Sequence, residues 1–265
     1  MTWLAVCALL WGSANGPARS RPITDPDTLT TAYEVSGVRM IQRIIPASEI
    51  VAVRLYLLGG TTQLTARTAG IEAVWLDASE DGTAQFPGEE ARRAMARTGC
   101  DVFIEPEADW TVFGFTGLAE DIDATWRVFA DRLIHPSLSD AAIRGAREWL
   151  LSQAHRRYTQ PDLRVQRLAT QALFHDHPYA LDPEGTEESL FSLTPTDVRT
   201  YARERLVASR LLLVVVGNVS RARVEALVAG SLGQLPRGDY RWTLPPAPVP
   251  PPGTRWLIDN RPLAT

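Results

Sequence analysis

Lysine is absent from this 265-residue chain, and all 27 basic side chains are arginines. The use of arginine in place of lysine throughout a chain indicates the base composition of the genome rather than a particular function. The arginines do not form a block, and the 31 acidic residues leave a net charge of −4. A protein that follows a phosphate backbone needs a basic patch or stripe. Nucleic acid is therefore excluded as an expected partner.

Cysteine and long apolar runs are also scarce. Cys7 and Cys100 cannot form a disulfide framework, and Cys100 is most simply a core or interface thiol. The apolar stretch "TWLAVCALLW" at 2–11 is too short to cross a bilayer. Because small residues follow it, at Gly12 and Ala14, it predicts a removable signal segment over 1–20. The chain is then exported, to the periplasm or outside the cell, without a transmembrane segment. An ordinary apolar N-terminus is the alternative, since a basic leading region is missing.

The remaining sequence alternates between strand and helix patterns. Segments rich in β-branched or alternating apolar residues predict strands, of which the first two are expected to pair, at 32–44, 50–60, 109–118 and 210–219. Apolar residues at helical spacing, with caps such as Thr194 before Pro195, predict helices at 87–99, 119–136, 139–158, 165–174, 194–206 and 221–236. Helix pairs separate the strands, so we expect an α+β fold in which helices pack on a mostly antiparallel sheet.

The order of segments divides the chain into parts. Residues 21–240 are expected to form one domain, and the proline-rich stretch "LPPAPVPPPG" within 241–254 is expected to be a stiff linker. The segment "RWLIDN" then reads as the start of another strand, so 255–265 would begin a second, truncated domain.

Several stretches of the sequence resemble the N-terminal domain of the pitrilysin/insulinase family of zinc peptidases, which includes the mitochondrial processing peptidases. They cover about residues 32–240: "SGVRMIQR", "LLGGTTQLTARTAGIEAVWLDASEDGT", "LIHPSLSDAAI", "HPYALDPEGTEESLFSLTPTDVRTY" and "LLLVVVGNV". The resemblance implies a LuxS/MPP-like metallopeptidase fold. It also implies a zinc motif H-x-x-E-H on the helix after the first strand pair, and a distant glutamate ligand.

This chain departs from that motif at each of its positions. Aligned through Gly70 and "EDGT", Ala73 and Asp77 stand at the two histidine positions and Leu76 stands at the catalytic base. The distant ligand falls at Gln153, or at Ser152 if the register shifts by one. Helical spacing places Ile71, Val74, Trp75 and Ala78 on a core stripe, with Ala73, Leu76 and Asp77 on the other side. One carboxylate and one amide cannot make a tight tetrahedral zinc site, so we expect neither a metal nor catalytic residues in this chain.

The resemblance also implies that substrate binds as an added strand along a sheet edge. The corresponding stretch is 99–111, and peptide contact is expected near Phe103, Ile104 and Glu105. Phe103 stands where the family commonly has asparagine, and Pro106 lacks the N–H that strand pairing requires. Substrate pairing along this edge is expected to be weakened.

Other polar clusters have structural explanations that outweigh functional ones. His175 and His177 could be a metal pair, but their spacing on a loop favours a structural role, and His155 fits a solvated helix face. Asp77, Glu80 and Asp81 could attract Ca²⁺, although a charged helix end explains them more simply.

The leading hypothesis is a non-catalytic homologue that pairs with a zinc-bearing family member and assists peptide binding, with zinc only in that partner. Two alternatives stay open. The chain could be an active zinc endopeptidase with displaced ligands, or a stand-alone peptide-binding or assembly domain.

Overall fold

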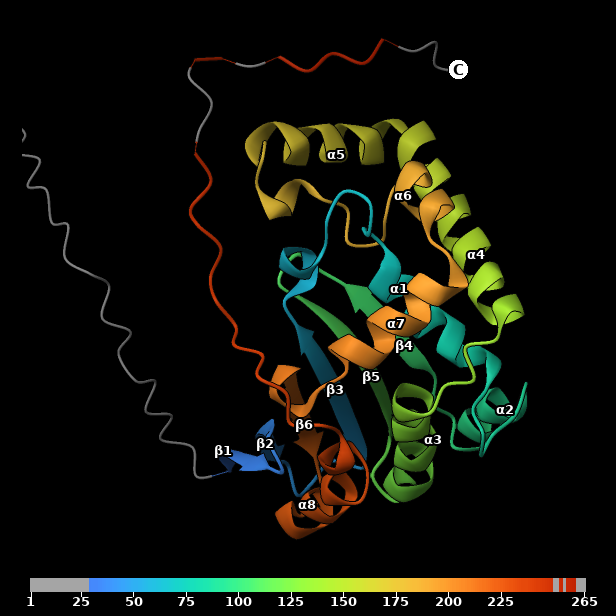
Figure 1. Ribbon diagram of the computed structural model, residues 1–265. Helices are drawn as coiled ribbons and strands as arrows, with labels where there is room; N and C mark the ends of the chain where they lie inside the picture. Colours follow the sequence, from blue (N-terminus) through green and yellow to red (C-terminus); the bar gives the residue numbers. More distant parts are fainter. Residues whose placement is uncertain (1–28, 250–252, 255, 261–265) are drawn as a thin grey trace, which may run out of the picture.

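A computed structural model describes residues 29–249, 253–254 and 256–260 (Figure 1). Its centre is a six-stranded sheet with the order β1-β2-β6-β3-β5-β4. The strands are β1 (Thr30–Val35), β2 (Val38–Ile44), β3 (Ile50–Leu58), β4 (Val102–Pro106), β5 (Trp110–Leu118) and β6 (Leu211–Gly217). The pair β2–β6 is parallel and the other four neighbouring pairs are antiparallel, so the expected mostly antiparallel sheet is confirmed.

The predicted pairing of 32–44 with 50–60 is wrong, because strand β6 lies between these two segments in the sheet. Residues 32–44 contain the hairpin β1–β2, closed at Ser36 and Gly37, which both have positive φ angles of 50° and 90°. Two such residues in succession form the tight turn that matches the twist of neighbouring strands. Strand β2 then pairs with β6, and β3 pairs with β6 and β5.

Helices form where the apolar spacing predicts them. They are α1 (Ile71–Ala78), α2 (Glu90–Arg97), α3 (Ile122–Ile134), α4 (Asp140–Thr159), α5 (Pro161–Leu173), α6 (Glu187–Ser192), α7 (Pro195–Arg205) and α8 (Arg221–Ala229). Helix α7 begins at the predicted cap, because the Asp197 N–H donates to Thr194 Oγ1 at 3.2 Å and the Asp197 carboxylate accepts from the Thr194 N–H. The short helix α6 has no counterpart among the expected elements.

The core lies between the helices and one face of the sheet (Figure 1). Alternate residues of β3 point into it, and Phe129 of α3 packs on Phe113 and Phe115 of β5 with ring centroids 4.8 and 5.1 Å apart. Trp75 and Trp126 are buried core aromatics, as expected. Cys100 is a buried free thiol.

The signal segment expected at 1–20 lies outside the described residues. Residues 241–249, 253–254 and 256–260 carry no helix or strand. The linker expected at 241–254 and the second domain expected to begin at 255 stay predictions. Within the described residues, no helix is both long and apolar enough to cross a membrane.

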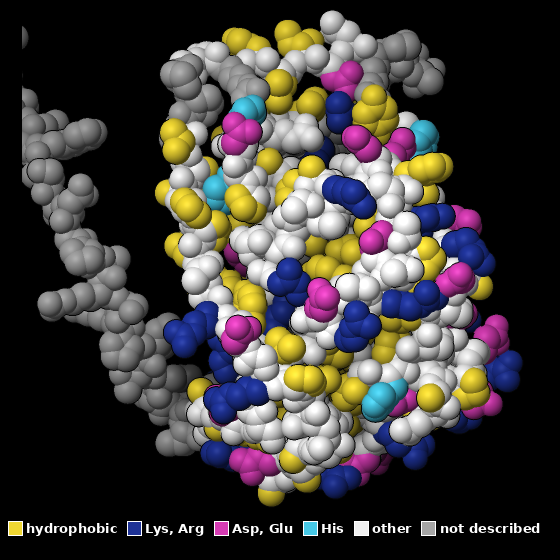
Figure 2. Space-filling view, viewed as in Figure 1, with side chains coloured by type: hydrophobic (Ala, Val, Ile, Leu, Met, Phe, Trp, Pro, Cys, Tyr) yellow, Lys and Arg dark blue, Asp and Glu magenta, His cyan; other side chains and the backbone are white. Residues whose placement is uncertain are grey.

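Charged side chains of both signs are interspersed on the face shown in Figure 2. The described arginine and acidic side chains on this face do not form a continuous basic stripe.

Candidate functional site

Helix α1, which carries the three degenerate motif positions, starts at a glycine that no other residue could replace easily. Gly70 has φ 86°, and a Cβ at this position would lie 2.7 Å from the carbonyl oxygen of Glu184. A left-handed backbone and close approach of a second chain segment both favour glycine. The 182–188 segment is therefore held against the start of α1.

The side of α1 that carries Ala73, Leu76 and Asp77 is largely buried. Ala73 is 1% exposed and Leu76 is 0% exposed, as completely buried as the core stripe of Val74 and Trp75. Helices α4 and α7 pack against α1 (Figure 1), and Tyr201 of α7 contacts Glu72 and Trp75. Asp77 is the only residue of α1 that is not buried. A helix that is apolar on nearly all sides is typical of a buried core helix.

Asp77 faces a groove of about 360 Å³ between the end of α1 and helix α4, beside Trp149 and Gly145. Burial and the negative charges of Glu80 and Glu184 together raise the pKa of the Asp77 carboxyl to about 7, against a smaller opposing effect of Arg132. Glu80 itself is bound by Arg92 at 3.1 Å. A carboxyl group that favours its neutral form is a poor ligand for a hard cation.

Gln153 lies on α4. Its Oε1 accepts a hydrogen bond from the Arg156 guanidinium, and it does not line the groove beside Asp77. The alternative position, Ser152, donates from Oγ to the carbonyl oxygen of Trp149 at 2.7 Å. Both candidate positions for the distant ligand thus have hydrogen-bond partners within α4.

These residues do not fit a zinc ion. Zinc in peptidases needs three nitrogen, sulfur or carboxylate ligands around one open position, and the four motif positions supply one carboxyl group, one amide and two buried hydrocarbons. In the part of the chain that the structure describes, no group of three or more His, Cys, Asp or Glu side chains could hold a metal ion.

The histidines have local partners. His177 Nδ1 accepts from the Tyr179 N–H at 3.2 Å, and its Nε2 donates to the carbonyl oxygen of Pro246 at 2.8 Å. Both ring nitrogens are thus engaged, and His177 fastens the proline-rich segment to the domain. His175 contacts the Asp176 carboxylate, and His155 contacts the Glu187 carboxylate. The structural role expected for His177 agrees with these contacts.

Strand β4 is the outer strand of the sheet next to β5, as the peptide-binding interpretation requires. It contains Phe103, Ile104 and Glu105, and Pro106 is its last residue. Phe103 lies opposite Gly114, and the Arg54 guanidinium lies 4.2 Å from the centre of its ring. Among the described strands β4 pairs with β5 alone, so the backbone groups of its other side are free for an added strand.

The sequence did not predict a buried polar network that involves α1. Glu72 Oε2 lies 2.6 Å from the Arg210 guanidinium and accepts from the Tyr201 hydroxyl at 3.0 Å, and all three side chains are buried. Burial lowers the pKa of Arg210, but Glu72 and Tyr201 outweigh it and leave that pKa raised. Burial and Glu72 both raise the pKa of Tyr201. The only signal in the sequence is the acid Glu72 among the apolar residues that begin this helix.

Three comparisons place this geometry among known proteins. The family model described as the peptidase M16 inactive domain matches residues 192–260, a stretch that contains none of the four motif positions. The uncharacterized zinc protease YmxG of Bacillus subtilis is 23% identical over 190 residues, which are 72% of this chain and 46% of that protein. The chain spans about half the length of the curated relatives it matches.

Solved structures share the fold at low identity. The peptidase M16 inactive domain from Pseudomonas fluorescens superposes with a TM-score of 0.73 at 17% identity, covering 83% of this chain and 54% of that one. The first half of the periplasmic protease PqqL from Escherichia coli gives 0.72 at 16% identity, covering 82% and 49%. The chain thus has the pitrilysin/insulinase-like fold of the M16 peptidases.

Proposed function

We propose that this chain is a non-catalytic homologue within the M16 peptidase group, which pairs with a zinc-bearing member and helps to bind its peptide substrate. The observation that carries the proposal is the burial of Ala73 and Leu76. Hydrocarbon side chains buried in the core occupy two positions that need a ligand and a base. Deprotonation of a metal-bound water then has no base at the resembling position.

The retained features support a binding role. The outer strand β4 keeps one unpaired side, which suits backbone pairing with an extended peptide. Phe103 and Arg54 shape the sheet face beside it. Pro106 ends the strand, so we expect pairing only along Val102–Glu105 and weak affinity from this edge alone.

The test is zinc content and cleavage of a quenched peptide, measured on the purified chain, on a zinc-bearing M16 peptidase from the same source, and on their mixture. We expect no stoichiometric zinc and no chelator-sensitive cleavage from the chain alone, and a faster or tighter reaction in the mixture. Stoichiometric zinc with cleavage by the chain alone would establish the displaced-ligand enzyme instead. A chain that neither associates with nor stimulates the zinc-bearing protein would refute the partner role and favour a stand-alone binding domain.

We also propose that the chain is exported. The apolar segment at 2–11 followed by small residues supports export, and one structure with this fold belongs to a periplasmic protease. Fractionation of the source cells, with N-terminal sequencing of the mature protein, tests this. A cytoplasmic protein that keeps its first residues would contradict it.

A further inference from the structure

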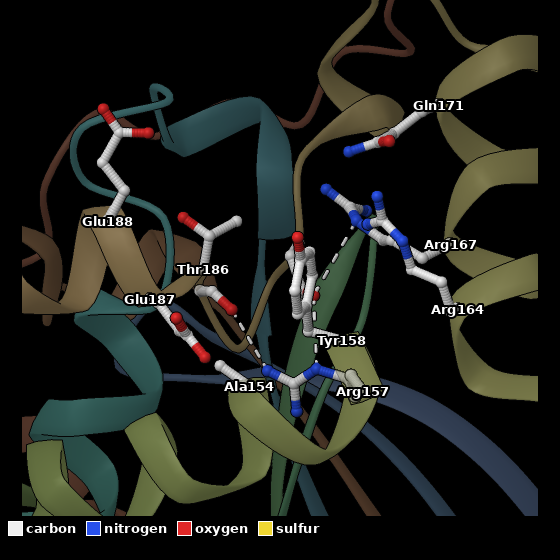
Figure 3. Close-up of a pocket in the computed structure, with 11 residues that line it drawn as sticks. Ala154, Arg157, Tyr158, Arg164, Arg167, Gln171, Thr186, Glu187 and Glu188 are labelled. Carbon is white, nitrogen blue, oxygen red and sulfur yellow. Dashed lines mark hydrogen bonds and ion pairs between the residues drawn. The ribbon is translucent and has the colours of Figure 1, made fainter. Parts of the chain in front are cut away.

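A cavity of about 400 Å³ lies between α4, α5 and the 182–188 segment (Figure 3). The proposed peptidase-related role does not use it. Its most prominent side chains are three arginines, Arg157 from α4 and Arg164 and Arg167 from α5. Because Arg164 and Arg167 are three residues apart on one helix, they lie on the same face and point into the same space.

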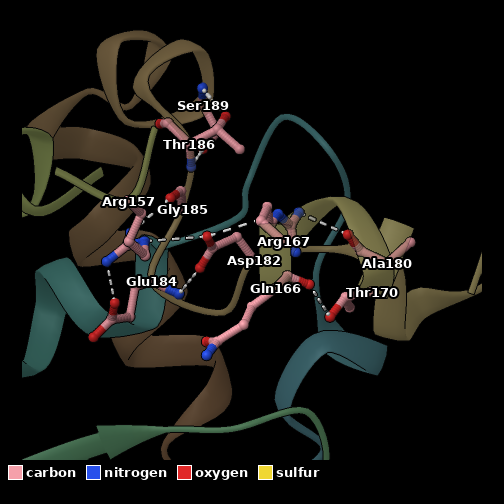
Figure 4. A network of polar contacts seen from close by, with 10 residues as sticks. All are labelled: Arg157, Gln166, Arg167, Thr170, Ala180, Asp182, Glu184, Gly185, Thr186 and Ser189. Atoms are coloured by element: carbon pink, nitrogen blue, oxygen red, sulfur yellow. Dashed lines mark hydrogen bonds and ion pairs between the residues drawn. The ribbon is translucent and has the colours of Figure 1, made fainter. Parts of the chain in front are cut away.

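The arginines differ in how completely they are neutralised. Arg157 contacts Asp182 at 3.3 Å, the Glu184 carboxylate, and the carbonyl oxygen of Gly185 at 3.1 Å (Figure 4). These contacts join α4 to the 182–185 segment, so Arg157 is a structural residue. Of its two acidic partners, Asp182 is shared with Arg167, whereas Glu184 is bound by Arg157.

Arg167 is held in place but is only weakly paired. It donates to the carbonyl oxygen of Ala180 at 2.7 Å, while Asp182, which it shares with Arg157, is 4.0 Å away (Figure 4). Burial lowers the pKa of Arg167, and Arg157 and Arg164 lower it further against the opposing effect of Asp182. A half-buried guanidinium with neighbouring positive charge attracts an additional anion.

Arg164 already binds a carboxylate at the rim. Its Nε donates to Asp259 Oδ2 at 2.8 Å, and its guanidinium lies 4.7 Å from the centre of the Tyr158 ring. Asp259 belongs to residues 256–260, which form neither helix nor strand. The chain thus shows the group that this rim accepts, which is a carboxylate on an extended segment.

The opposite wall limits how much negative charge can enter. Glu187 contacts His155 at 2.9 Å, and the Glu188 carboxylate points away from the arginines in Figure 3. A ligand with several negative charges would be repelled by these acids, whereas one carboxylate directed at α5 would not. The cavity therefore suits a singly charged group better than a polyanion.

We propose that this cavity binds a single carboxylate on an extended peptide, received by Arg164 and Arg167, and that Asp259 competes with the peptide for Arg164. The carboxylate comes from an acidic side chain or from a peptide C-terminus, which share this chemistry. The proposal deepens the proposed function, since it rests on peptide as the ligand and assigns the peptide a chemical class.

The test uses the full chain and short rhodamine-labelled Ala-Gly peptides in fluorescence anisotropy titrations. One peptide has a central Asp and an amidated C-terminus, a second has Asn in its place, and a third has the Asn and a free C-terminus. We expect the Asp peptide or the free C-terminus to bind about tenfold more tightly than the amidated Asn peptide, the size expected for one charge-assisted hydrogen bond. Whichever of the two binds more tightly identifies the source of the carboxylate.

Variants separate the cavity from general charge effects. Arg164→Gln should lower the ratio of affinities for the carboxylate and amidated Asn peptides by about tenfold. Asp259→Asn should tighten binding of the acidic peptide because the internal competitor is lost. The matched control is Arg93→Gln, an exposed arginine of α2 that contacts Glu89, and it should leave the preference unchanged. Circular dichroism checks that each variant is folded.

Equal affinities for the three peptides, no measurable binding of the acidic ones, or an unchanged preference in folded Arg164→Gln would each overturn the proposal. These outcomes are distinguishable from failure of the proposed function, which is decided by zinc content and by association with a zinc-bearing peptidase. A chain that stimulates such a peptidase but binds all three peptides equally would keep the function and refute the carboxylate site.

Discussion

Replacing Asp77 with asparagine should stabilise the folded chain in mildly alkaline solution and leave it nearly unchanged in acid. Burial, together with the charges of Glu80 and Glu184, raises the pKa of this carboxyl from 3.8 to about 7. Since one pKa unit corresponds to about 1.4 kcal/mol, ionised Asp77 costs the folded state at most about 4 kcal/mol. An asparagine has nearly the same shape and carries no charge, so it removes this cost.

The sign follows from which state holds the proton. Below about pH 4 both the folded and the unfolded chain carry protonated Asp77, and the group has no effect on stability. Between about pH 4 and pH 7 the unfolded chain loses the proton while the folded chain keeps it, so the free energy of unfolding falls as pH rises. Above about pH 7 the cost is complete and constant.

The assay is urea unfolding, followed by tryptophan fluorescence, of wild type and Asp77→Asn at about pH 5 and about pH 8. Asp81→Asn, which removes an exposed carboxylate from the adjoining 3-10 turn, is the matched control. We expect the stabilisation by Asp77→Asn to be larger at the higher pH. A difference between variant and wild type that is equal at both pH values, or a destabilised variant at the higher pH, would refute the raised pKa of this partly buried carboxyl.

Three other substitutions test the remaining structural claims. Glu72→Ala should destabilise the fold by about 3–5 kcal/mol because it leaves Arg210 buried without its partner. The double variant Glu72→Met/Arg210→Met should recover much of this loss. If chemical denaturation shows that the losses of the two single variants simply add in the double variant, the pairing is contradicted. His177→Ala should expose the proline-rich segment to limited proteolysis and lower the free energy of unfolding by about 1 kcal/mol. His175→Ala should have neither effect. Identical digestion patterns of the two variants would exclude the role of His177 in holding this segment. Ala73→His should lower the unfolding midpoint by overpacking worth about 1–3 kcal/mol; an unchanged midpoint would mean that the position has free space.

Local signals predicted much of this fold. Thr194 before Pro195 fixed the start of α7, and the apolar run at 210–219 contained β6, because caps and alternation act between residues close in sequence. The partner of β2 was beyond such reasoning, since pairing with β6 depends on segments at opposite ends of the domain. The turn at Ser36 was missed for a different reason, because a serine with positive φ is uncommon.

The candidate site shows a similar division. The absence of ligand residue types at Ala73, Leu76 and Asp77 is readable from the sequence alone. Their environments are not, since helical periodicity separates two sides of α1 and cannot show that both are buried in the folded domain. Likewise, Glu72 reads as a charged surface residue until Arg210 is found beside it.

The position of β6 in the sheet has a consequence for synthesis of the chain. Arg39 lies opposite Leu212 and Val53 lies opposite Val215, so this late strand separates two early ones. A nascent chain on the ribosome therefore holds the hairpin β1–β2 and strand β3 with unsatisfied edges until residues 211–217 emerge. Closure over so long a loop slows folding and leaves apolar edges exposed in the meantime. Dependence on a chaperone during translation is the expected biological cost of this topology.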